Sequence, residues 1–179
     1  MNNALSCKNF ALDVKEISEE GKFSGYASVF NIVDACDDIV LRGAFEKTIV
    51  DKWPKLLWQH NAAEPIGIFT DIKENDMGLL VSAQLFLGIQ KAREAYELLK
   101  GGAISGLSIG YIPVKWEFEE RENSIVVLLK EIDLWEISLV TFPANPLANV
   151  ADVKTIQEYK NSDTIKAAQK LLQTLKGEL

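Results

Sequence analysis

"LSIGYIPVKWEFEE" (residues 107–120) and "SIVVLLKEIDLWEISLVTFPAN" (residues 124–145) are the two longest strand-like stretches of the chain. Both are rich in β-branched and aromatic residues, which favour a pleated, half-buried surface. The polar segment "EERENS" (residues 119–124) joins them as a turn. Pro113 places part of the first strand at an edge or a bulge. These stretches predict a long hairpin on which a larger sheet is built.

Shorter patterns extend this sheet and add helices. Strand-like runs occupy residues 9–18, 23–34, 55–60, 64–76 and 78–88. Apolar residues at helical spacing predict helices over residues 44–51, 89–100 and 162–176. Together they predict an α+β or mainly β fold, an antiparallel β-barrel of about seven strands surrounded by helices. We expect residues 1–150 to form the barrel domain. Residues 151–179 are expected to form a helical segment that packs on the barrel or lies in a dimer interface.

Composition narrows the classes of function. With 179 residues, of which 47% are hydrophobic and 25% charged, the chain suits one globular domain. Its net charge of -7 and the lack of a basic stripe argue against a nucleic-acid partner, so protein or peptide partners are expected. No apolar run approaches the ~20 residues of a membrane helix, and the N-terminus lacks the pattern of a signal peptide. We therefore expect no membrane association.

The cysteines and the histidine do not predict a metal site. Cys7 and Cys36 lack the C-x-x-C spacing, and His60 is the only histidine in the chain. A zinc cluster of the usual Cys and His ligands cannot be assembled from them. We expect no metal and no cofactor.

Residues 106–110 read G-L-S-I-G and match G-x-S-x-G, the spacing around the nucleophile of α/β hydrolases. In that fold a strand precedes the serine and a helix follows it, whereas here a predicted helix precedes Ser108 and a predicted strand follows. The match to that fold is therefore accidental, and Ser108 remains a candidate nucleophile on another scaffold. The flanking glycines leave the backbone open for a substrate chain to approach. Ser105, in the same glycine-rich loop, is the competing serine, and either serine can also be a plain turn residue.

A nucleophilic serine needs a base and an acid that orients it. His60 ends the strand over residues 55–60, where it would reach the rim of the sheet, although a lone histidine can also have no chemical role. Glu136 shares a face with Ile132 and Leu134 on a period of two, where an unpaired carboxylate would cost several kcal/mol. We therefore expect Glu136 to have a partner, unless the opposite face of the strand is the buried one.

Four stretches form a pattern larger than these single residues: residues 25–49, 56–69, 92–111 and 131–150. Their most specific parts are "QH" followed by "PIG", G-x-S-I-G after a helix, and E-x-S-L-V-T-x-P-A-N-P. In this order and spacing they resemble the prohead maturation proteases of tailed bacteriophages, over most of the chain.

The resemblance implies a fold similar to the herpesvirus assembly proteases. It also implies a serine endopeptidase that acts inside the assembling prohead in the host bacterial cytoplasm. Its substrates would be scaffold or the scaffold-like arm of the major capsid protein, and also itself. His60 matches the general base and Ser108 the nucleophile. The herpesvirus relatives use a second histidine, which this chain lacks, so Glu136 takes the third place. By analogy, the backbone N–H groups of Ala144 and Asn145 form the oxyanion hole.

Two further expectations accompany this resemblance. Because the herpesvirus relatives gain activity by dimerising, we expect a homodimer and a catalytic serine that is only partly assembled in the free protein. The competing hypothesis is an inactive capsid-assembly or scaffolding protein that keeps the barrel as a binding module.

Overall fold

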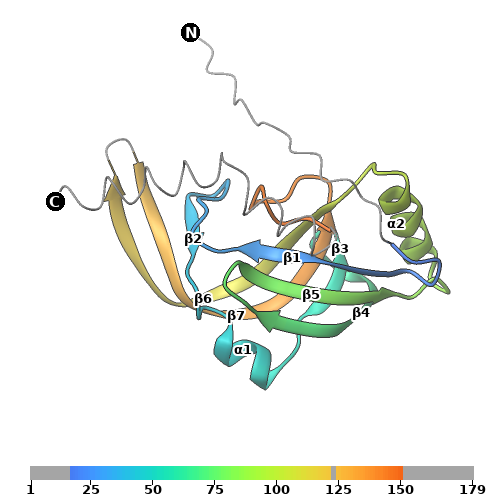
Figure 1. Ribbon diagram of the computed structural model, residues 1–179, viewed down its shortest axis with the longest axis horizontal. Helices are drawn as coiled ribbons and strands as arrows, with labels where there is room; N and C mark the ends of the chain where they lie inside the picture. The colour runs from blue at the N-terminus through green and yellow to red at the C-terminus, as the bar shows by residue number, and fades with distance from the viewer. Residues whose placement is uncertain (1–16, 122–123, 151–179) are drawn as a thin grey trace, which may run out of the picture.

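The computed structural model describes residues 17–121 and 124–150, in which seven strands form one sheet flanked by two helices (Figure 1). In chain order the elements are β1 (Lys22–Val29), β2 (Asp38–Val40), α1 (Glu46–Asp51), β3 (Lys55–Trp58), β4 (Asn61–Glu74), β5 (Gly78–Leu85), α2 (Gln90–Lys100), β6 (Gly106–Arg121) and β7 (Ser124–Val140). Six of these seven strands match predicted strands, whereas β2 was not predicted as a strand. The predicted helix over residues 162–176, and most of the strand over residues 9–18, lie outside the described residues.

Strand β7 organises the sheet. The hairpin partner β6 pairs with it antiparallel from Gly106 to Arg121, as the sequence predicts. The other edge of β7 pairs with β3 and with β2, and both of these ladders are parallel. The predicted antiparallel sheet therefore also contains two parallel ladders, which the sequence did not predict. Segments that reach β7 through long connections, rather than through tight turns, are free to pair in parallel.

The sheet curls into a half-barrel with strand order β1-β5-β4-β3-β7-β2, and β6 lies on β7 (Figure 1). No ladder joins the edge strands β1 and β6 within the described residues. Residues 148–150 bridge them instead. The Tyr26 N–H of β1 donates to Asn149 O at 3.1 Å, and the Leu107 N–H of β6 donates to Ala148 O at 2.9 Å. Closure thus depends on a segment that follows β7.

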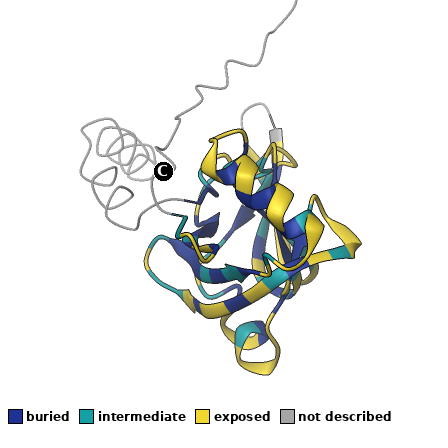
Figure 2. Cartoon of the chain, turned by 90° about the vertical axis from the view of Figure 1, so that its right-hand side faces the viewer, coloured by how far each residue is buried: buried dark blue, intermediate teal, exposed yellow. Residues whose placement is uncertain are grey.

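One hydrophobic core fills the inside of the curl, so the inner sides of the elements are buried (Figure 2). Its largest fully buried side chains include Phe45, Leu56, Ile66, Leu79, Leu85, Leu99, Leu107, Leu134 and Ile137. Helix α2 buries Ala92, Tyr96 and Leu99 of its predicted apolar stripe, whereas Ile89 at its start is exposed. The helix ends before Gly102, whose φ of 70° is readily adopted by glycine. The predicted ring of further helices stays a prediction, since α1 and α2 are the helices that the described residues contain.

Candidate active site

A β-bulge at Trp135 decides which way the candidate acid points. Gly110 pairs with Glu136 while its neighbour Tyr111 pairs with Leu134, so Trp135 is an extra residue in β7. The bulge switches the alternation of faces, and Glu136 lies opposite to the core residue Leu134. The prediction that these two side chains share a face is therefore wrong. Glu136 lies on the outer face of the curled sheet, with its side chain 14% exposed.

His60 lies in a two-residue turn between β3 and β4, next to the predicted strand tip. Gln59 and His60 both have left-handed backbones, with φ of 50° and 59°, which is the geometry of a tight hairpin turn usually made by Asn and Gly. Such a conformation costs about 1–2 kcal/mol for each residue that is not glycine. The turn is held by β7, because the Gln59 N–H donates to Leu139 O at 3.0 Å and Gln59 Nε2 donates to Thr141 Oγ1 at 2.9 Å.

His60, Glu136 and Ser138 form a closed set of hydrogen bonds. His60 Nδ1 lies 2.5 Å from Glu136 Oε1. The Ser138 hydroxyl donates to Glu136 Oε2 at 2.6 Å and accepts the His60 N–H at 3.0 Å. A carboxylate only accepts hydrogen bonds, so the neutral imidazole carries its proton on Nδ1 and leaves Nε2 as a proton acceptor. Glu136 thus has the polar partner that the sequence predicts.

The two glycines beside Ser108 make room for the protein itself. A Cβ on Gly110 would collide with Glu136 Oε1. A Cβ on Gly106 would lie 2.8 Å from Pro143 Cδ. Protein atoms therefore occupy the space beside both glycines. The prediction that a substrate chain approaches the backbone there is wrong. Gly110 instead permits the Glu136 carboxylate to reach His60.

Ser108 lies on β6 directly opposite Ser138 of β7, and only 5% of it is exposed. Residues paired in this way have Cβ atoms about 4.5–5.5 Å apart. The Ser108 hydroxyl makes no hydrogen bond within the described residues. The structure therefore joins His60 to Glu136 and places Ser108 on the neighbouring strand, without a Ser108–His60 hydrogen bond. The competing Ser105 donates to Asn149 Oδ1 at 3.3 Å.

The predicted oxyanion residues follow β7 and share a small cavity with Ser108. The side chain of Asn145 holds their turn, because Nδ2 donates to Val29 O at 2.8 Å and Oδ1 accepts the Leu147 N–H at 3.1 Å. The backbone N–H groups of Ala144 and Asn145 have no hydrogen-bond acceptor in the described part of the chain. Both donors are therefore uncommitted, as an oxyanion hole requires.

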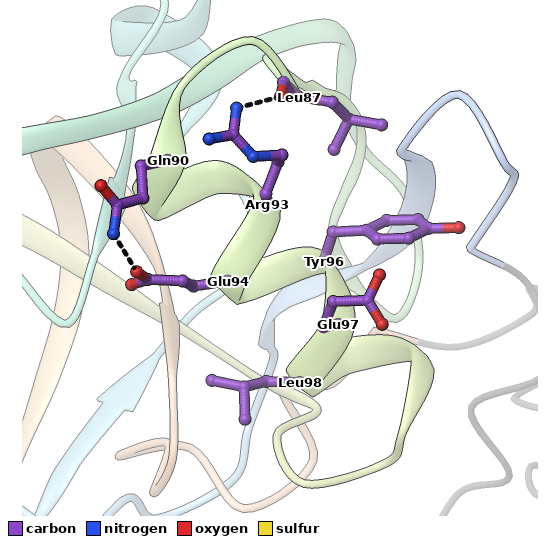
Figure 3. A pocket seen from close by; sticks show the side chains of 7 residues that line it. All are labelled: Leu87, Gln90, Arg93, Glu94, Tyr96, Glu97 and Leu98. Atoms are coloured by element: carbon purple, nitrogen blue, oxygen red, sulfur yellow. Dashed lines mark hydrogen bonds between the residues drawn. The ribbon is translucent and has the colours of Figure 1, made fainter.

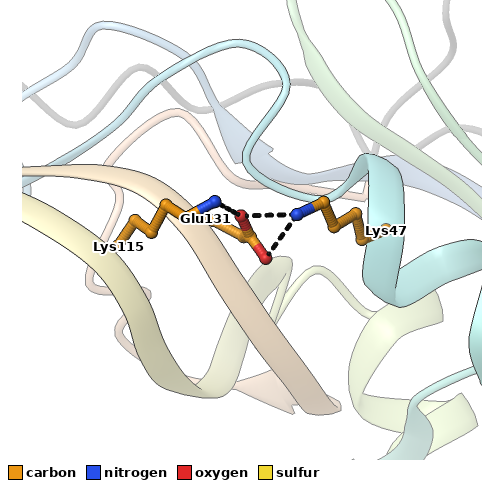
Figure 4. A network of polar contacts seen from close by, with 3 residues as sticks. All are labelled: Lys47, Lys115 and Glu131. Atoms are coloured by element: carbon orange, nitrogen blue, oxygen red, sulfur yellow. Dashed lines mark hydrogen bonds and ion pairs between the residues drawn. The ribbon is translucent and has the colours of Figure 1, made fainter.

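The acidic residues earlier on β7 form ion pairs instead. Glu131 accepts hydrogen bonds from Lys47 at 2.9 Å and Lys115 at 2.6 Å (Figure 4). The Lys115 ammonium holds the pKa of Glu131 below its ordinary value. Asp133 lies 2.7 Å from Lys52. Partly exposed ion pairs of this kind contribute little to stability, and neither acid contacts His60.

A wide surface hollow lies remote from these residues. It has a volume of about 890 Å³ and lies over α2, between Leu87 and Leu98 (Figure 3). None of the candidate catalytic residues lines it. Among the residues that the structure describes, no group of His, Cys, Asp and Glu is arranged to hold a metal ion. None of the described helices is long and apolar enough to cross a membrane.

Three supporting residues of the site were not predicted from the sequence: Ser138, Gln59 and Thr141. The spacing of Glu136 and Ser138 two residues apart was visible, and it puts both side chains on one face. The parallel pairing of β3 with β7 was not readable from the sequence, and this pairing brings the turn at His60 to both of them.

A histidine held by a carboxylate, with a serine on the adjacent strand, is the kind of arrangement found in serine hydrolases. Comparison with known protein families gives a narrower result. Residues 9–162 match the family described as caudovirus prohead serine protease. The chain belongs to this family.

Two relatives found by sequence agree with the family assignment. The prohead protease of Enterobacteria phage HK97 is 33% identical over 158 residues, which cover 83% of this chain and 69% of that protein. The capsid polyprotein of Pseudomonas phage PAJU2 is 36% identical over 152 residues, covering 81% of this chain. This chain spans only 22% of that polyprotein's length. Among solved structures, the capsid assembly protease of bacteriophage T4 matches with a TM-score of 0.47 and 10% identity, covering 66% of this chain and 82% of that one.

Proposed function

We propose that this chain is a serine endopeptidase of phage capsid maturation, with Ser108 as nucleophile, His60 as general base and Glu136 as the orienting acid. The observation that carries the proposal is the 2.5 Å contact between His60 Nδ1 and Glu136 Oε1, made beside the strand that holds Ser108. It leaves His60 Nε2 as the acceptor that a serine proton needs.

The reaction is acyl transfer. Ser108 Oγ bonds to the substrate carbonyl carbon as His60 Nε2 takes the hydroxyl proton, and Glu136 stabilises the imidazolium. The imidazolium then protonates the leaving amine, the C–N bond breaks, and an acyl-enzyme remains. Water attacks this ester, with His60 again as the base, and releases the acid and free Ser108. The N–H groups of Ala144 and Asn145 would stabilise the oxyanion, by about 3 kcal/mol per donor at comparable sites.

The reaction requires a hydrogen bond from Ser108 Oγ to His60 Nε2, which this structure does not contain. Hydrogen bonds of this type tighten in many enzymes only once the substrate is bound. We expect rotation of the Ser108 side chain to complete the bond when substrate binds or when a homodimer forms. We also propose that the fold is related to that of the herpesvirus proteases. Residues 151–179 are proposed to form a helical segment that packs on the barrel or lies in a dimer interface.

The proposed substrates are the major capsid protein and scaffold inside the assembling prohead, together with the chain itself. The PAJU2 relative supports a capsid substrate, because that protein is named a capsid polyprotein and contains a region similar to this chain. The family name supports action within the prohead of a tailed phage.

Incubation of the purified chain with its own capsid protein, read by mass spectrometry, tests the proposal. We expect defined cleavage products from the wild type and from Ser105→Ala. Ser108→Ala and His60→Ala should each slow cleavage by at least about 10⁴-fold, because residues of a catalytic unit act together. Undiminished cleavage by Ser108→Ala would refute the assigned nucleophile. Binding of capsid protein by a folded wild type, without any cleavage, would favour the inactive scaffolding protein.

A further inference from the structure

The small cavity that Ser108 shares with Ala144 and Asn145 extends beside the proposed nucleophile. It has a volume of about 90 Å³ and lies between β1, the loop before β2, and β6. Ser108 lines it together with two carboxylates, Asp34 of that loop and Asp38 at the start of β2. At ~30 Å³ for each water in the liquid, the volume equals about three waters, which suits one slender side chain.

The carboxylates of this cavity are held in place. Asp34 Oδ1 accepts the N–H groups of Cys36 and Asp38 at 2.8 and 2.9 Å. Asp38 Oδ2 accepts the Tyr111 hydroxyl at 2.7 Å. Both acids are half-buried, and neither forms an ion pair with a lysine or arginine of the described residues. The cavity therefore presents fixed negative charge that no lysine or arginine of the described residues neutralises.

The environment of Asp34 is consistent with this unneutralised negative charge. Burial raises the pKa of Asp34, and the neighbouring carboxylates Asp38 and Asp37 raise it further. A cation placed in the cavity would reverse this repulsion, because an opposite charge nearby favours the ionised acid.

A buried hydroxyl in the same cavity points independently to a ligand. Ser28 is 1% exposed and lines the cavity, and its Oγ has no hydrogen-bond partner among residues 17–121 and 124–150. A buried polar atom without a partner is costly, so such atoms are usually satisfied. An ammonium or guanidinium group has N–H donors for this oxygen as well as for the carboxylates.

The other walls determine which kind of cation fits. Ala27, Ile32 and Val40 supply apolar surface next to the acids. Lysine and arginine combine an aliphatic stem with a charged end, which matches such a mixed lining. A bound metal ion is a poorer match, since the described acids and Cys36 are not arranged as metal ligands.

We infer that this cavity is a substrate subsite that receives a lysine or arginine side chain next to the scissile bond. The inference rests on the proposed function, because Ser108 marks where the bond is cut. Asp34 and Asp38 are the specificity-determining residues, and Ser28 accepts a hydrogen bond from the bound cation.

Cleavage of peptides tests the specificity. Cleavage sites are first mapped by mass spectrometry on a peptide library, and matched peptides then carry Lys, Arg or the uncharged norleucine beside the cut. We expect kcat/KM for the Lys peptide to exceed that for norleucine at least tenfold. Asp38→Asn and Asp34→Asn, which keep the acceptor oxygens, should each reduce this ratio several-fold. Asp37→Asn removes the same charge from the same loop without lining the cavity and should reduce the ratio less than either Asp34→Asn or Asp38→Asn. Equal cleavage of the Lys and norleucine peptides overturns the subsite.

A binding measurement separates this inference from the peptidase activity. In Cys7→Ser the remaining thiol is Cys36, which is exposed and lines the cavity. We expect n-butylammonium to slow alkylation of Cys36 at least threefold, while n-butanol at the same concentration does not. Asp38→Asn should abolish the protection and Asp37→Asn should retain it. If no peptide is cleaved but this protection is found, the subsite stands and the proposed peptidase fails. Equal effects of n-butylammonium and n-butanol overturn the subsite, whether or not peptides are cleaved.

Discussion

The Ser138 hydroxyl satisfies two groups of the site, the Glu136 carboxylate and the His60 N–H. Ser138→Ala leaves both without this partner, and a buried unsatisfied group costs about 1–3 kcal/mol. We expect urea unfolding to show a loss of that size, and kcat/KM to fall about 10- to 100-fold as His60 loses its orientation. Ser138→Thr keeps a hydroxyl and should restore most of the activity. If Ser138→Ala lowers stability but leaves kcat/KM unchanged, Ser138 supports only the fold.

Gly110 is required because the Glu136 carboxylate, on the paired strand β7, fills the space beside it. A Cβ at this position would collide with Glu136 Oε1, so Gly110→Ala should displace the acid and lower kcat/KM at least about tenfold, equivalent to 1.4 kcal/mol. Gly88→Ala is the matched control, because nothing lies within 4 Å of the added methyl group. Peptide hydrolysis by the two folded variants measures the difference. Equal rates would show that Glu136 does not need its observed position.

At the scale of elements, the turn at Gln59 and His60 stores backbone strain that β7 holds in place. Gln59→Gly and Gln59→Ala both remove the hydrogen bond to Thr141, but only alanine keeps the cost of a left-handed backbone. We expect the glycine variant to be more stable by about 1 kcal/mol in urea unfolding. At the exposed helical position Glu97, Glu97→Ala should instead be more stable than Glu97→Gly, by about 1 kcal/mol. The same order at both positions would contradict a strained turn.

The sequence reveals local secondary structure better than it reveals the pairing of distant strands. The long hairpin and α2 were predicted because alternation and helical spacing are local properties of the chain. Glu136 was assigned to the wrong face because one bulged residue, Trp135, shifts the alternation without changing composition. His60 and Glu136 were selected as candidates from their residue types and a family resemblance. Their contact depends on the parallel β3–β7 ladder, which pairs residues 81 positions apart and leaves no local signal.

At the scale of the whole molecule, the half-barrel closes through residues 148–150. Gly25 of β1 lets this segment approach, since a Cβ there would lie 2.8 Å from Val150 Cα. Gly25→Ala should therefore lower the free energy of unfolding by about 1–3 kcal/mol, as overpacking does elsewhere. Because the same segment covers the start of β6, we expect activity to fall with stability. Unfolding in urea, with Gly88→Ala as the unchanged reference, checks this. An unaffected Gly25→Ala would mean that the bridge contributes little.

The most direct test of the catalytic assignment is covalent labelling of the nucleophile. The wild-type chain, under conditions in which it cleaves capsid protein, is treated with a fluorophosphonate and analysed by peptide mass spectrometry. If Ser108, His60 and Glu136 are the catalytic residues, we predict one adduct, on Ser108. It is lost in His60→Ala and much slower to form in Glu136→Gln. An adduct on Ser105 or Ser138 instead, or labelling of Ser108 at the same rate without His60, would contradict it.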